Sequence, residues 1–186
     1  MIVFDCDGTL VDSQSNIVTK MTTVFNGLGL PQPGPRAIRE LIGLSLEETI
    51  QRLRPETDQA GVDRFVDEYR RAFFSDDDAK AAPEPLFDHA EVVLQDLQGR
   101  GYLLGVATGK SRRGLDAVLA GHDLLDIFVT QQTTDGHPGK PNPSMLYQAM
   151  AEAGVEAHDT LMLGDTSFDM TMAVNAGVHP IGAAWG

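Results

Sequence analysis

The sequence has a single cysteine, few basic residues and no long apolar run, and each shortage excludes a class of protein. Cys6 has no second cysteine with which to form an internal disulfide, which fits a reducing compartment. The sequence has 14 Lys and Arg residues and 27 Asp and Glu residues, which gives a formal net charge of −13. This charge argues against nonspecific binding to nucleic acid or to an anionic membrane surface, although one lysine or metal ion can reverse the sign of a single pocket.

No apolar run is long enough to span a bilayer, and Met1 leads directly into Ile2-Val3-Phe4 without the basic segment of a signal peptide. We therefore expect a cytoplasmic protein with no membrane partner. Hydrophobic residues make up 42% of the 186 residues and charged residues 22%, which is typical of a soluble globular protein. The length suffices for a core domain with a small inserted one.

The core is predicted from two separate parts of the chain. Ile2-Val3-Phe4 is a short apolar run that predicts a buried strand, and it ends at the acidic turn Asp5-Cys6-Asp7-Gly8-Thr9. Helices and strands alternate from about residue 88 onward, which predicts a parallel sheet covered by helices on both faces. We expect helices at 88–98, 112–120, 143–153 and 167–176, and strands at 102–107, 126–130, 160–163 and 178–181.

The intervening residues show helical periodicity only. We expect helices at 15–28, 35–53 with a break at Gly43, and 59–75. Ser45-Leu46-Glu47-Glu48 has the pattern of a capping box, which would begin a helix. Asp76-Asp77-Asp78 and residues 81–85 interrupt the periodicity and predict a linker.

The predicted fold class is therefore α/β: a Rossmann-like doubly wound parallel sheet with an inserted all-helical cap domain. The core domain would comprise residues 1–13 and 81–186, and the cap domain residues 14–80. A cap that opens and closes would need hinges near residues 10–14 and 80–85.

Polar side chains follow several predicted strands. Asp5 and Asp7 follow the first strand, Thr108 follows the next, and Asp165 follows the strand at 160–163. Lys140 lies in a loop rich in glycine and proline. Because ligands bind beyond the carboxyl ends of strands in a doubly wound sheet, we expect these groups to converge at one edge.

The acids in this set suit a metal ion. Asp5 and Asp7 point to the same side if the backbone is extended, and such close carboxylates repel unless a cation or proton separates them. Asp165 and Asp169 are four residues apart at the start of a helix, so both can face one point. Several carboxylates with loop carbonyls suit Mg²⁺. Asp169 has an alternative role, which is to stabilise the helix N-terminus through the helix dipole.

Other residues suit a phosphate group. Lys140 supplies a compact positive charge, and Thr108 with Gly109-Lys110-Ser111 offers a hydroxyl and backbone N–H groups at a helix N-terminus. We expect Cys6 to be a small core residue whose backbone N–H, rather than its thiol, faces the phosphate. The five histidines show no recognisable pairing and are expected at the surface or in loops.

Four segments resemble, in order, the signature sequences of the haloacid dehalogenase superfamily, specifically its phosphoglycolate phosphatase-like branch with a helical cap. They are Asp5-Cys6-Asp7-Gly8-Thr9-Leu10, Ala107-Thr108-Gly109-Lys110, Gly139-Lys140-Pro141-Asn142-Pro143 and Gly164-Asp165-Thr166-Ser167-Phe168-Asp169. The resemblance covers essentially the whole chain. Any one segment is moderately specific, and the four together are very specific.

The resemblance implies a phosphoric monoester hydrolase that uses Mg²⁺. Asp5 would be the nucleophile that forms an aspartyl-phosphate, and Asp7 would protonate the leaving oxygen and then deprotonate the attacking water. Mg²⁺ would be held by Asp5, the backbone carbonyl of Asp7 and Asp165, with Asp169 as a ligand or outer partner. The implied phosphate-binding residues are Cys6, Gly8, Thr9, Thr108, Gly109, Lys110 and Lys140, of which Thr108 and Lys140 also count as catalytic.

The expected substrate is a small phosphorylated metabolite, and the chain would act as a monomer or homodimer. One alternative is a sugar phosphomutase of the same fold, similar to beta-phosphoglucomutase. Another is a receiver-like signalling domain, which would lack the helical insertion and the late Gly-Asp-x-x-x-Asp segment. Arg36, Arg39 and Gly43-Leu44-Ser45 form either a substrate loop or a plain helix junction. The family often continues with a further strand and helix, which leaves open whether an edge of the core lies beyond residue 186.

Overall fold

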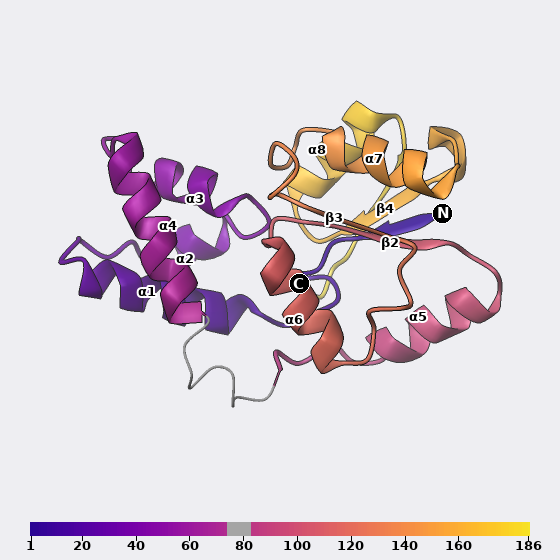
Figure 1. Cartoon of the computed structure of the whole chain (residues 1–186), viewed down its shortest axis with the longest axis horizontal. Coiled ribbons are helices and arrows are strands. Elements are labelled where there is room, and N and C mark those ends of the chain that lie inside the picture. Colours follow the sequence, from indigo (N-terminus) through magenta and orange to yellow (C-terminus); the bar gives the residue numbers. More distant parts are fainter. Residues whose placement is uncertain (74–82) are drawn as a thin grey trace.

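The computed structural model describes residues 1–73 and 83–186, which form a parallel sheet with flanking helices and a separate group of helices (Figure 1). The strands are β1 (Ile2–Phe4), β2 (Leu104–Thr108), β3 (Thr130–Thr133), β4 (Leu161–Gly164) and β5 (His179–Gly182). All pairings are parallel, in the order β3-β2-β1-β4-β5. The chain order reverses at β1, so the carboxyl ends of β1, β2 and β4 mark the switch point at which ligands bind in such sheets.

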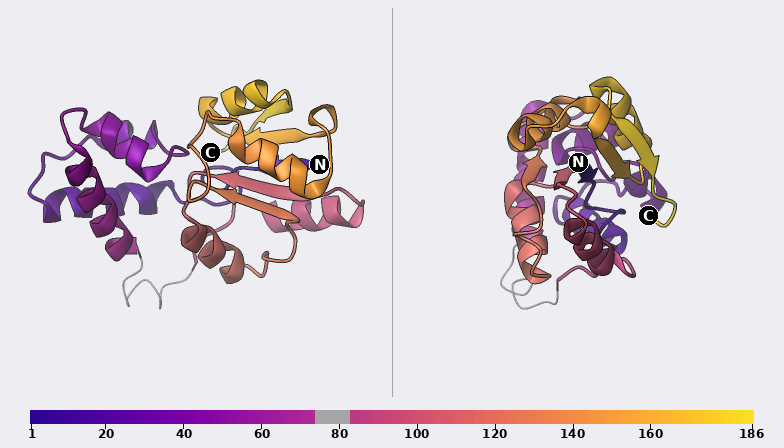
Figure 2. Two further views of the ribbon diagram at one scale, coloured as in Figure 1. Left: turned by 45° about the horizontal axis from the view of Figure 1, so that its top comes forward. Right: turned by 90° about the vertical axis from the view of Figure 1, so that its right-hand side faces the viewer.

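Helices cover both faces of the sheet (Figure 2). They are α5 (Ala90–Gly99), α6 (Arg112–Gly121), α7 (Ser144–Ala153) and α8 (Ser167–Ala176), and a short 3₁₀ helix (Ala157–Asp159) precedes β4. Ile2 and Phe4 of β1 pack with α5 and α6, whereas Val3 packs with α7 and α8. Because successive strand residues point to opposite faces, this three-residue strand contributes to both layers of the core.

The remaining helices, which we call the cap, have a hydrophobic core of their own. They are α1 (Gln14–Gly27), α2 (Pro35–Arg39), α3 (Leu46–Leu53) and α4 (Gln59–Phe73). At the centre of the cap, Phe25 and Phe65 meet edge to face with ring centroids 4.8 Å apart. The buried apolar side chains of the cap form a cluster distinct from the two clusters that flank the sheet, so the cap is stabilised by its own burial of apolar surface.

The two connections between the cap and the sheet adjoin each other. Val11 pairs with Leu86 in an antiparallel bridge, and the Asp12 N–H donates to the Pro85 carbonyl at 2.9 Å. Segments that are remote in sequence, at the two predicted hinges, are therefore tied together by backbone hydrogen bonds.

Several expectations fall outside the described residues: the end of the helix at 59–75, the Asp76-Asp77-Asp78 linker and the domain boundary between residues 80 and 81. The division of the chain at residues 13/14 and 80/81 stays a prediction. Within residues 1–73 and 83–186, none of the helices combines the length and apolar character that crossing a membrane requires.

The predicted strand at 126–130 is wrong, because β3 spans Thr130–Thr133. The apolar run Ile127-Phe128-Val129 suggested a strand, but Phe128 is buried in the core before the strand begins and Val129 is 54% exposed. The polar residues that follow form an edge strand through backbone pairing with β2. Backbone pairing at a sheet edge does not require an apolar run, so the apolar signal misplaced this strand.

Candidate active site

Asp5 is the first residue after β1 and is fully buried. Its backbone N–H donates to the Leu163 carbonyl at 2.9 Å, and its Oδ1 accepts the Cys6 N–H at 2.7 Å. The Cys6 side chain lies in the apolar core, as expected, and burial raises the pKa of its thiol well above the ordinary value. A protonated, buried thiol is inert, so the backbone N–H of Cys6 is the group that serves the site.

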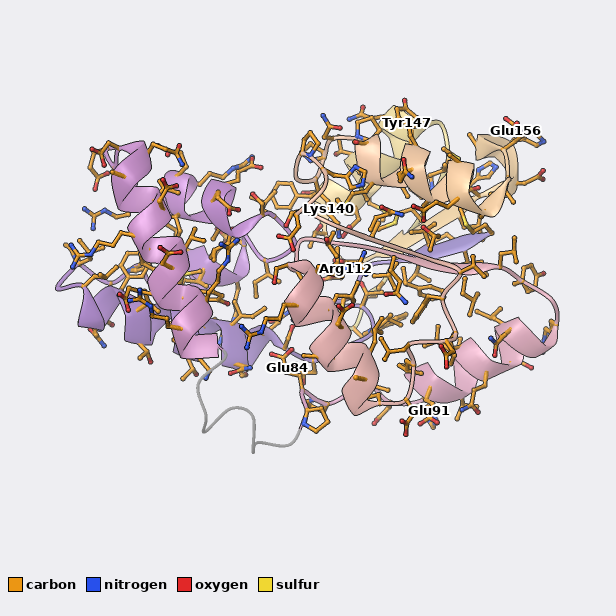
Figure 3. All side chains as sticks on the ribbon, in the orientation of Figure 1. Glu84, Glu91, Arg112, Lys140, Tyr147 and Glu156 are labelled. Atoms are coloured by element: carbon orange, nitrogen blue, oxygen red, sulfur yellow. The ribbon has the colours of Figure 1, made fainter. Side chains whose placement is uncertain are left out.

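Lys140 reaches Asp5 from the loop before α7. Its Nζ lies 2.6 Å from Asp5 Oδ1 and 2.6 Å from Asp169 Oδ1, and all three side chains are completely buried. Burial by itself would lower the pKa of the Lys140 ammonium, but the two carboxylates outweigh it and the pKa lies above its ordinary value. Lys140 therefore stays charged, and Figure 3 shows it on the side of the core that faces the cap.

Asp169 serves both the start of α8 and the site. Its Oδ2 accepts the Thr166 N–H at 3.1 Å, while the Thr166 hydroxyl accepts the Asp169 N–H at 3.3 Å in a capping box. Its Oδ1 faces Lys140. The capping contacts and the contact with Lys140 thus use different oxygens of one carboxylate, and a metal role for Asp169 stays a prediction.

Asp165 lies against the turn that follows β1. Its Oδ1 accepts a hydrogen bond from the Thr9 hydroxyl at 3.0 Å. A Cβ on Gly8 would lie 2.2 Å from Asp165 Oδ2, and Gly8 has a φ of +78°. Both the backbone conformation and the space therefore require glycine where these two turns meet.

The site fits a divalent cation. Carboxylate oxygens of Asp5, Asp165 and Asp169 lie within 4.8 Å of one another, and Asp5 Oδ2 is buried without a hydrogen-bond partner among the residues that the structure describes. Asp5 and Asp169 share the ammonium of Lys140. Burial, with smaller contributions from neighbouring carboxylates, raises the pKa of both Asp5 and Asp165. A set of three carboxyl groups beside one ammonium suits Mg²⁺, which would favour the ionised forms of Asp5 and Asp165.

Asp7 and Lys110 form a second charged cluster. Lys110 Nζ lies 2.8 Å from Asp7 Oδ1, which also accepts a hydrogen bond from the Ser13 hydroxyl, and 3.1 Å from Glu84 Oε2. The carboxylate of Asp7 is not part of the three-acid group found in the described residues. A metal contact through the Asp7 backbone carbonyl and a phosphate contact of Lys110 stay predictions.

Thr108 is fully buried where β2 ends, and its hydroxyl accepts the Lys110 N–H at 3.2 Å. Ser111 caps the following helix, α6, by accepting the Gly114 N–H at 3.2 Å. This helix N-terminus therefore lies at the same sheet edge as Asp5. A Cβ on Gly109 would lie only 2.5 Å from the Leu44 carbonyl oxygen, so the cap approaches the core closely here.

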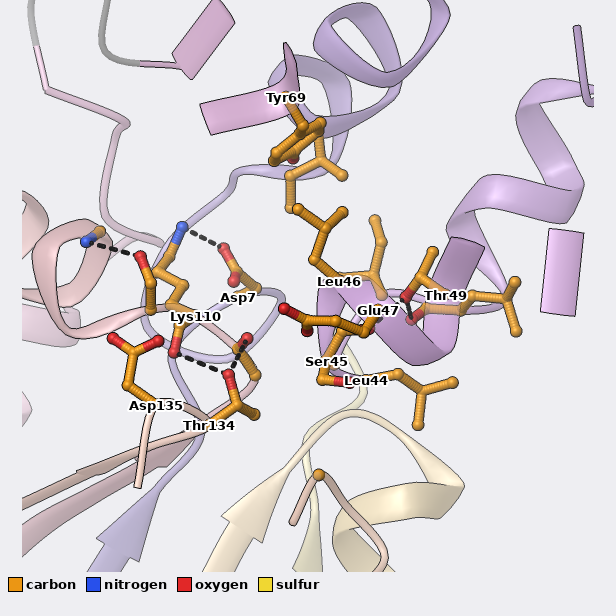
Figure 4. A pocket seen from close by; sticks show the side chains of 18 of the residues that line it. Asp7, Leu44, Ser45, Leu46, Glu47, Thr49, Tyr69, Lys110, Thr134 and Asp135 are labelled. Carbon is orange, nitrogen blue, oxygen red and sulfur yellow. Dashed lines mark hydrogen bonds and ion pairs between the residues drawn. The ribbon is translucent and has the colours of Figure 1, made fainter. Parts of the chain in front are cut away.

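The cap covers this edge and encloses a cavity of about 520 Å³ (Figure 4). Leu44, Leu46 and Tyr69 line it from the cap, and Asp7 and Lys110 line it from the core. Asp5 is not among its lining residues. The cavity therefore opens on the acid that would protonate a leaving group, which is where the alcohol part of an ester would lie.

The Gly43-Leu44-Ser45 turn is both a helix junction and part of the cavity wall. Ser45 caps α3 by accepting the Glu48 N–H at 3.2 Å, and all three residues of the turn line the cavity. By contrast, the Arg36 side chain is 91% exposed and pairs with Glu40 on the surface. The turn is thus a helix junction that also lines the cavity, and its contact with a substrate stays a prediction, whereas Arg36 lies on the surface.

Sequence reasoning missed Ser13, Asn16 and Glu84, all of which connect to the second cluster. Glu84 accepts a hydrogen bond from Asn16 at 2.6 Å, although the two residues are 68 positions apart. His122 and His137 lie in loops, as expected, but their contacts were not foreseen: His122 Nε2 lies 2.7 Å from the Glu84 carbonyl, and His137 lines the cavity. No local pattern marks such contacts, because they depend on how the cap docks on the sheet.

Comparison with known proteins agrees with this geometry. The sequence profile of the family described as "Haloacid dehalogenase-like hydrolase" matches residues 2–183. The chain belongs to this family.

Similar proteins include two bacterial phosphatases and a solved structure. Probable phosphatase IndB of Dickeya dadantii (strain 3937) is 38% identical over 189 residues, which cover 100% of this chain and 81% of that one. Phosphoglycolate phosphatase of Vibrio parahaemolyticus serotype O3:K6 is 28% identical over 191 residues, which cover 100% and 84%. The crystal structure of a haloacid dehalogenase-like hydrolase from Bacteroides fragilis matches with a TM-score of 0.91 at 28% identity, covering 100% and 87%.

These findings confirm the resemblance to phosphoglycolate phosphatase-like members of the superfamily and the α/β fold. They identify the chain as an enzyme of the hydrolase class, with phosphatases among its relatives, rather than a receiver-like signalling domain.

Proposed function

We propose that this hydrolase is a Mg²⁺-dependent phosphatase that transfers the phosphoryl group of a small phosphate monoester to Asp5 and then to water. The observation that carries the proposal is the buried Asp5 Oδ2, which has no hydrogen-bond partner among the described residues and lies in a group with Asp165 and Asp169. A divalent ion bound by these acids would offset their charge, so that an anionic phosphate could approach a carboxylate.

Asp5 would attack phosphorus while the ester oxygen departs, which leaves a phosphoaspartate that water then hydrolyses. Lys140 and the Cys6 N–H hold Asp5 through Oδ1, so the orientation of the carboxylate is set before substrate binds. The Thr108 hydroxyl and the N–H groups at the start of α6 would bind the transferring phosphoryl oxygens.

Asp7 would give a proton to the leaving oxygen and later remove one from the attacking water. Its place on the wall of the cavity supports this role, because the alcohol part of the substrate would lie there. A cavity of about 520 Å³ has room for an alcohol larger than two carbon atoms, and Leu44 and Leu46 give it apolar surface. We therefore favour a small phosphorylated metabolite with some apolar surface.

The net charge of −13 argues against nucleic-acid and membrane partners. The cytoplasmic location and the monomeric or homodimeric state stay predictions.

The test is phosphate release from p-nitrophenyl phosphate. We expect turnover with Mg²⁺, its loss on chelation, its return when Mg²⁺ is restored, and a fall in kcat of about 10³-fold or more for Asp5→Asn. The control is Asp96→Asn, an exposed acid of α5 that pairs with Arg100. Full activity of Asp5→Asn, or no phosphate release from this ester and a panel of phosphorylated metabolites, would contradict the proposal. Interconversion of sugar phosphates without phosphate release would identify a phosphomutase instead.

A further inference from the structure

Glu84 joins three parts of the molecule. Its Oε2 lies 3.1 Å from Lys110 Nζ in the core, and its Oε1 accepts a hydrogen bond at 2.6 Å from Asn16 Nδ2 in the first turn of α1. Glu84 itself lies in the second connection between cap and core, and its side chain is only 12% exposed. Figure 3 shows it at the junction of the two units. The two carboxylate oxygens thus bind one partner from each unit.

The backbone of Glu84 is also fixed. Its carbonyl accepts a hydrogen bond from His122 Nε2 at 2.7 Å, just beyond the end of α6. The preceding Pro83 lies so close to Gly121 that a Cβ there would be 2.7 Å from the Pro83 Cβ. Glu84 therefore presents its carboxylate from a firmly held position rather than from a loose connection.

The ammonium of Lys110 lies between two acids, Asp7 and Glu84. Burial by itself would lower the pKa of Lys110, but the neighbouring negative charges, chiefly that of Asp7, outweigh it and raise the pKa above its ordinary value. A lysine side chain is long and flexible, so a single contact with Asp7 would leave the ammonium several accessible positions. The second contact, with Glu84, reduces the number of these positions.

This arrangement also orients Asp7. The ammonium of Lys110 and the hydroxyl of Ser13 both donate to Asp7 Oδ1. Two contacts at one oxygen fix how the carboxyl group of Asp7 is turned. The groups at Oδ1 therefore set the direction in which the rest of the carboxyl group faces.

Resting on the proposed function, we propose that Glu84 is a positioning residue that holds Lys110 and, through it, keeps the Asp7 carboxyl group directed at the leaving oxygen. Because Asn16 binds the same carboxylate, the alignment of the acid is linked to the docking of α1. Glu84 itself touches neither the phosphoryl group nor the metal-binding acids in this scheme.

Phosphate esters differ in how strongly their hydrolysis depends on a general acid, and this difference gives a specific readout. p-Nitrophenolate is a stable anion and leaves without a proton, whereas the more basic phenolate leaves poorly unless it is protonated. Misalignment of Asp7 should therefore slow the hydrolysis of phenyl phosphate much more than that of p-nitrophenyl phosphate. A general loss of folding would slow both equally.

The experiment compares kcat and KM for these two esters, with Mg²⁺ present, in the wild type, Glu84→Gln and Glu84→Ala. Hydrolysis of the phosphoaspartate is common to both esters, so the comparison uses kcat/KM, which ends at phosphoryl transfer to Asp5. Since a placed general acid contributes about 10²–10⁴-fold, we expect Glu84→Ala to lower kcat/KM for phenyl phosphate about tenfold or more, and kcat/KM for p-nitrophenyl phosphate less than about threefold. Glu84→Gln keeps an oxygen acceptor for Asn16 and should fall between. The control is Glu68→Gln, an exposed acid of α4 that pairs with Arg71.

A ratio of the two kcat/KM values that stays at the wild-type level in Glu84→Gln and Glu84→Ala would overturn the proposal. Should Glu84→Ala fail to fold, Glu84→Gln alone decides. Asn16→Ala should change the ratio in the same direction by a smaller factor, and an unchanged ratio would overturn the link to α1. A wild type that hydrolyses neither ester would contradict the proposed function itself. If the wild type hydrolyses both esters and the ratio of their rates does not depend on Glu84, only this inference is contradicted.

Discussion

Lys140 and Lys110 are both buried between two carboxylates, but they lie at opposite ends of the bond that would break. Lys140 contacts Asp5, the proposed nucleophile, at 2.6 Å and is completely buried. Lys110 contacts Asp7, the proposed acid, at 2.8 Å, and its side chain is 8% exposed. One lysine therefore serves the phosphoryl end of the site, and the other serves the leaving-group end.

The two ends also differ in where their parts come from. Both ion pairs that Lys140 makes with described residues lie within the core, with Asp5 after β1 and Asp169 in α8. The cluster around Lys110 draws on the connection that holds Glu84, and through it on the cap helix α1. The cluster around Asp5 is therefore built by the core, whereas the cluster around Asp7 also depends on a contact with the cap.

The largest expected effect is a difference between Lys140→Met and Lys110→Met. We expect Lys140→Met to lower kcat/KM for p-nitrophenyl phosphate by about 10³-fold and stability by about 3–5 kcal/mol, because Asp5 and Asp169 would lose their buried counter-charge. Lys110→Met should cost less than about threefold in kcat/KM for this ester, because p-nitrophenolate leaves without a proton, and about 1–3 kcal/mol of stability. Urea unfolding measures the loss of stability and steady-state kinetics measures the loss of kcat/KM. Equal losses in the two variants would show that the two lysines do not differ in this way.

A second expectation is that only the phosphoryl end responds to Mg²⁺. Burial raises the pKa of Asp5 and Asp165, so ionising them opposes folding, and the stability of the chelated protein should fall as pH rises through their raised values, above the ordinary pKa of about 3.9. Mg²⁺ favours the ionised acids and should stabilise the protein by about 2.7 kcal/mol at 100 times its Kd.

Thermal unfolding with and without Mg²⁺, at acidic and at neutral pH, measures this effect. The stabilisation should be larger at neutral pH, should be lost in Asp165→Asn and should persist in Lys110→Met. If Mg²⁺ does not shift the unfolding temperature of the wild type, the three acids do not form a metal site.

The smallest expected effect concerns the contact between the two units. Gly109→Ala places a Cβ 2.5 Å from the Leu44 carbonyl oxygen, so the cap turn must move away, and we expect kcat/KM to fall about tenfold. Gly27→Ala is the matched control, because a Cβ at Gly27 meets nothing within 4 Å. Comparable activity of the two variants would show that close docking of the cap at this point is not needed.

The repeating pattern of the chain predicted most of the sheet and its helices, because strands and helices bury apolar residues with characteristic periods. The same logic failed at β3, where the apolar run lies before the strand and the paired residues are polar. Asp5, Asp165 and Asp169 were expected at one sheet edge because parallel strands end together, and the structure brings their carboxylates within 4.8 Å.

The sequence alone determined which residues follow the strands, and therefore which acids and which lysine gather at the phosphoryl end. Only the tertiary structure decided that Asp7 is held by Lys110 and Ser13, and that Glu84 joins Lys110 to Asn16. The physical reason is that strand ends are brought together by the local pattern of backbone pairing. Contacts such as that of Glu84 exist only once the separately folded cap has docked on the sheet.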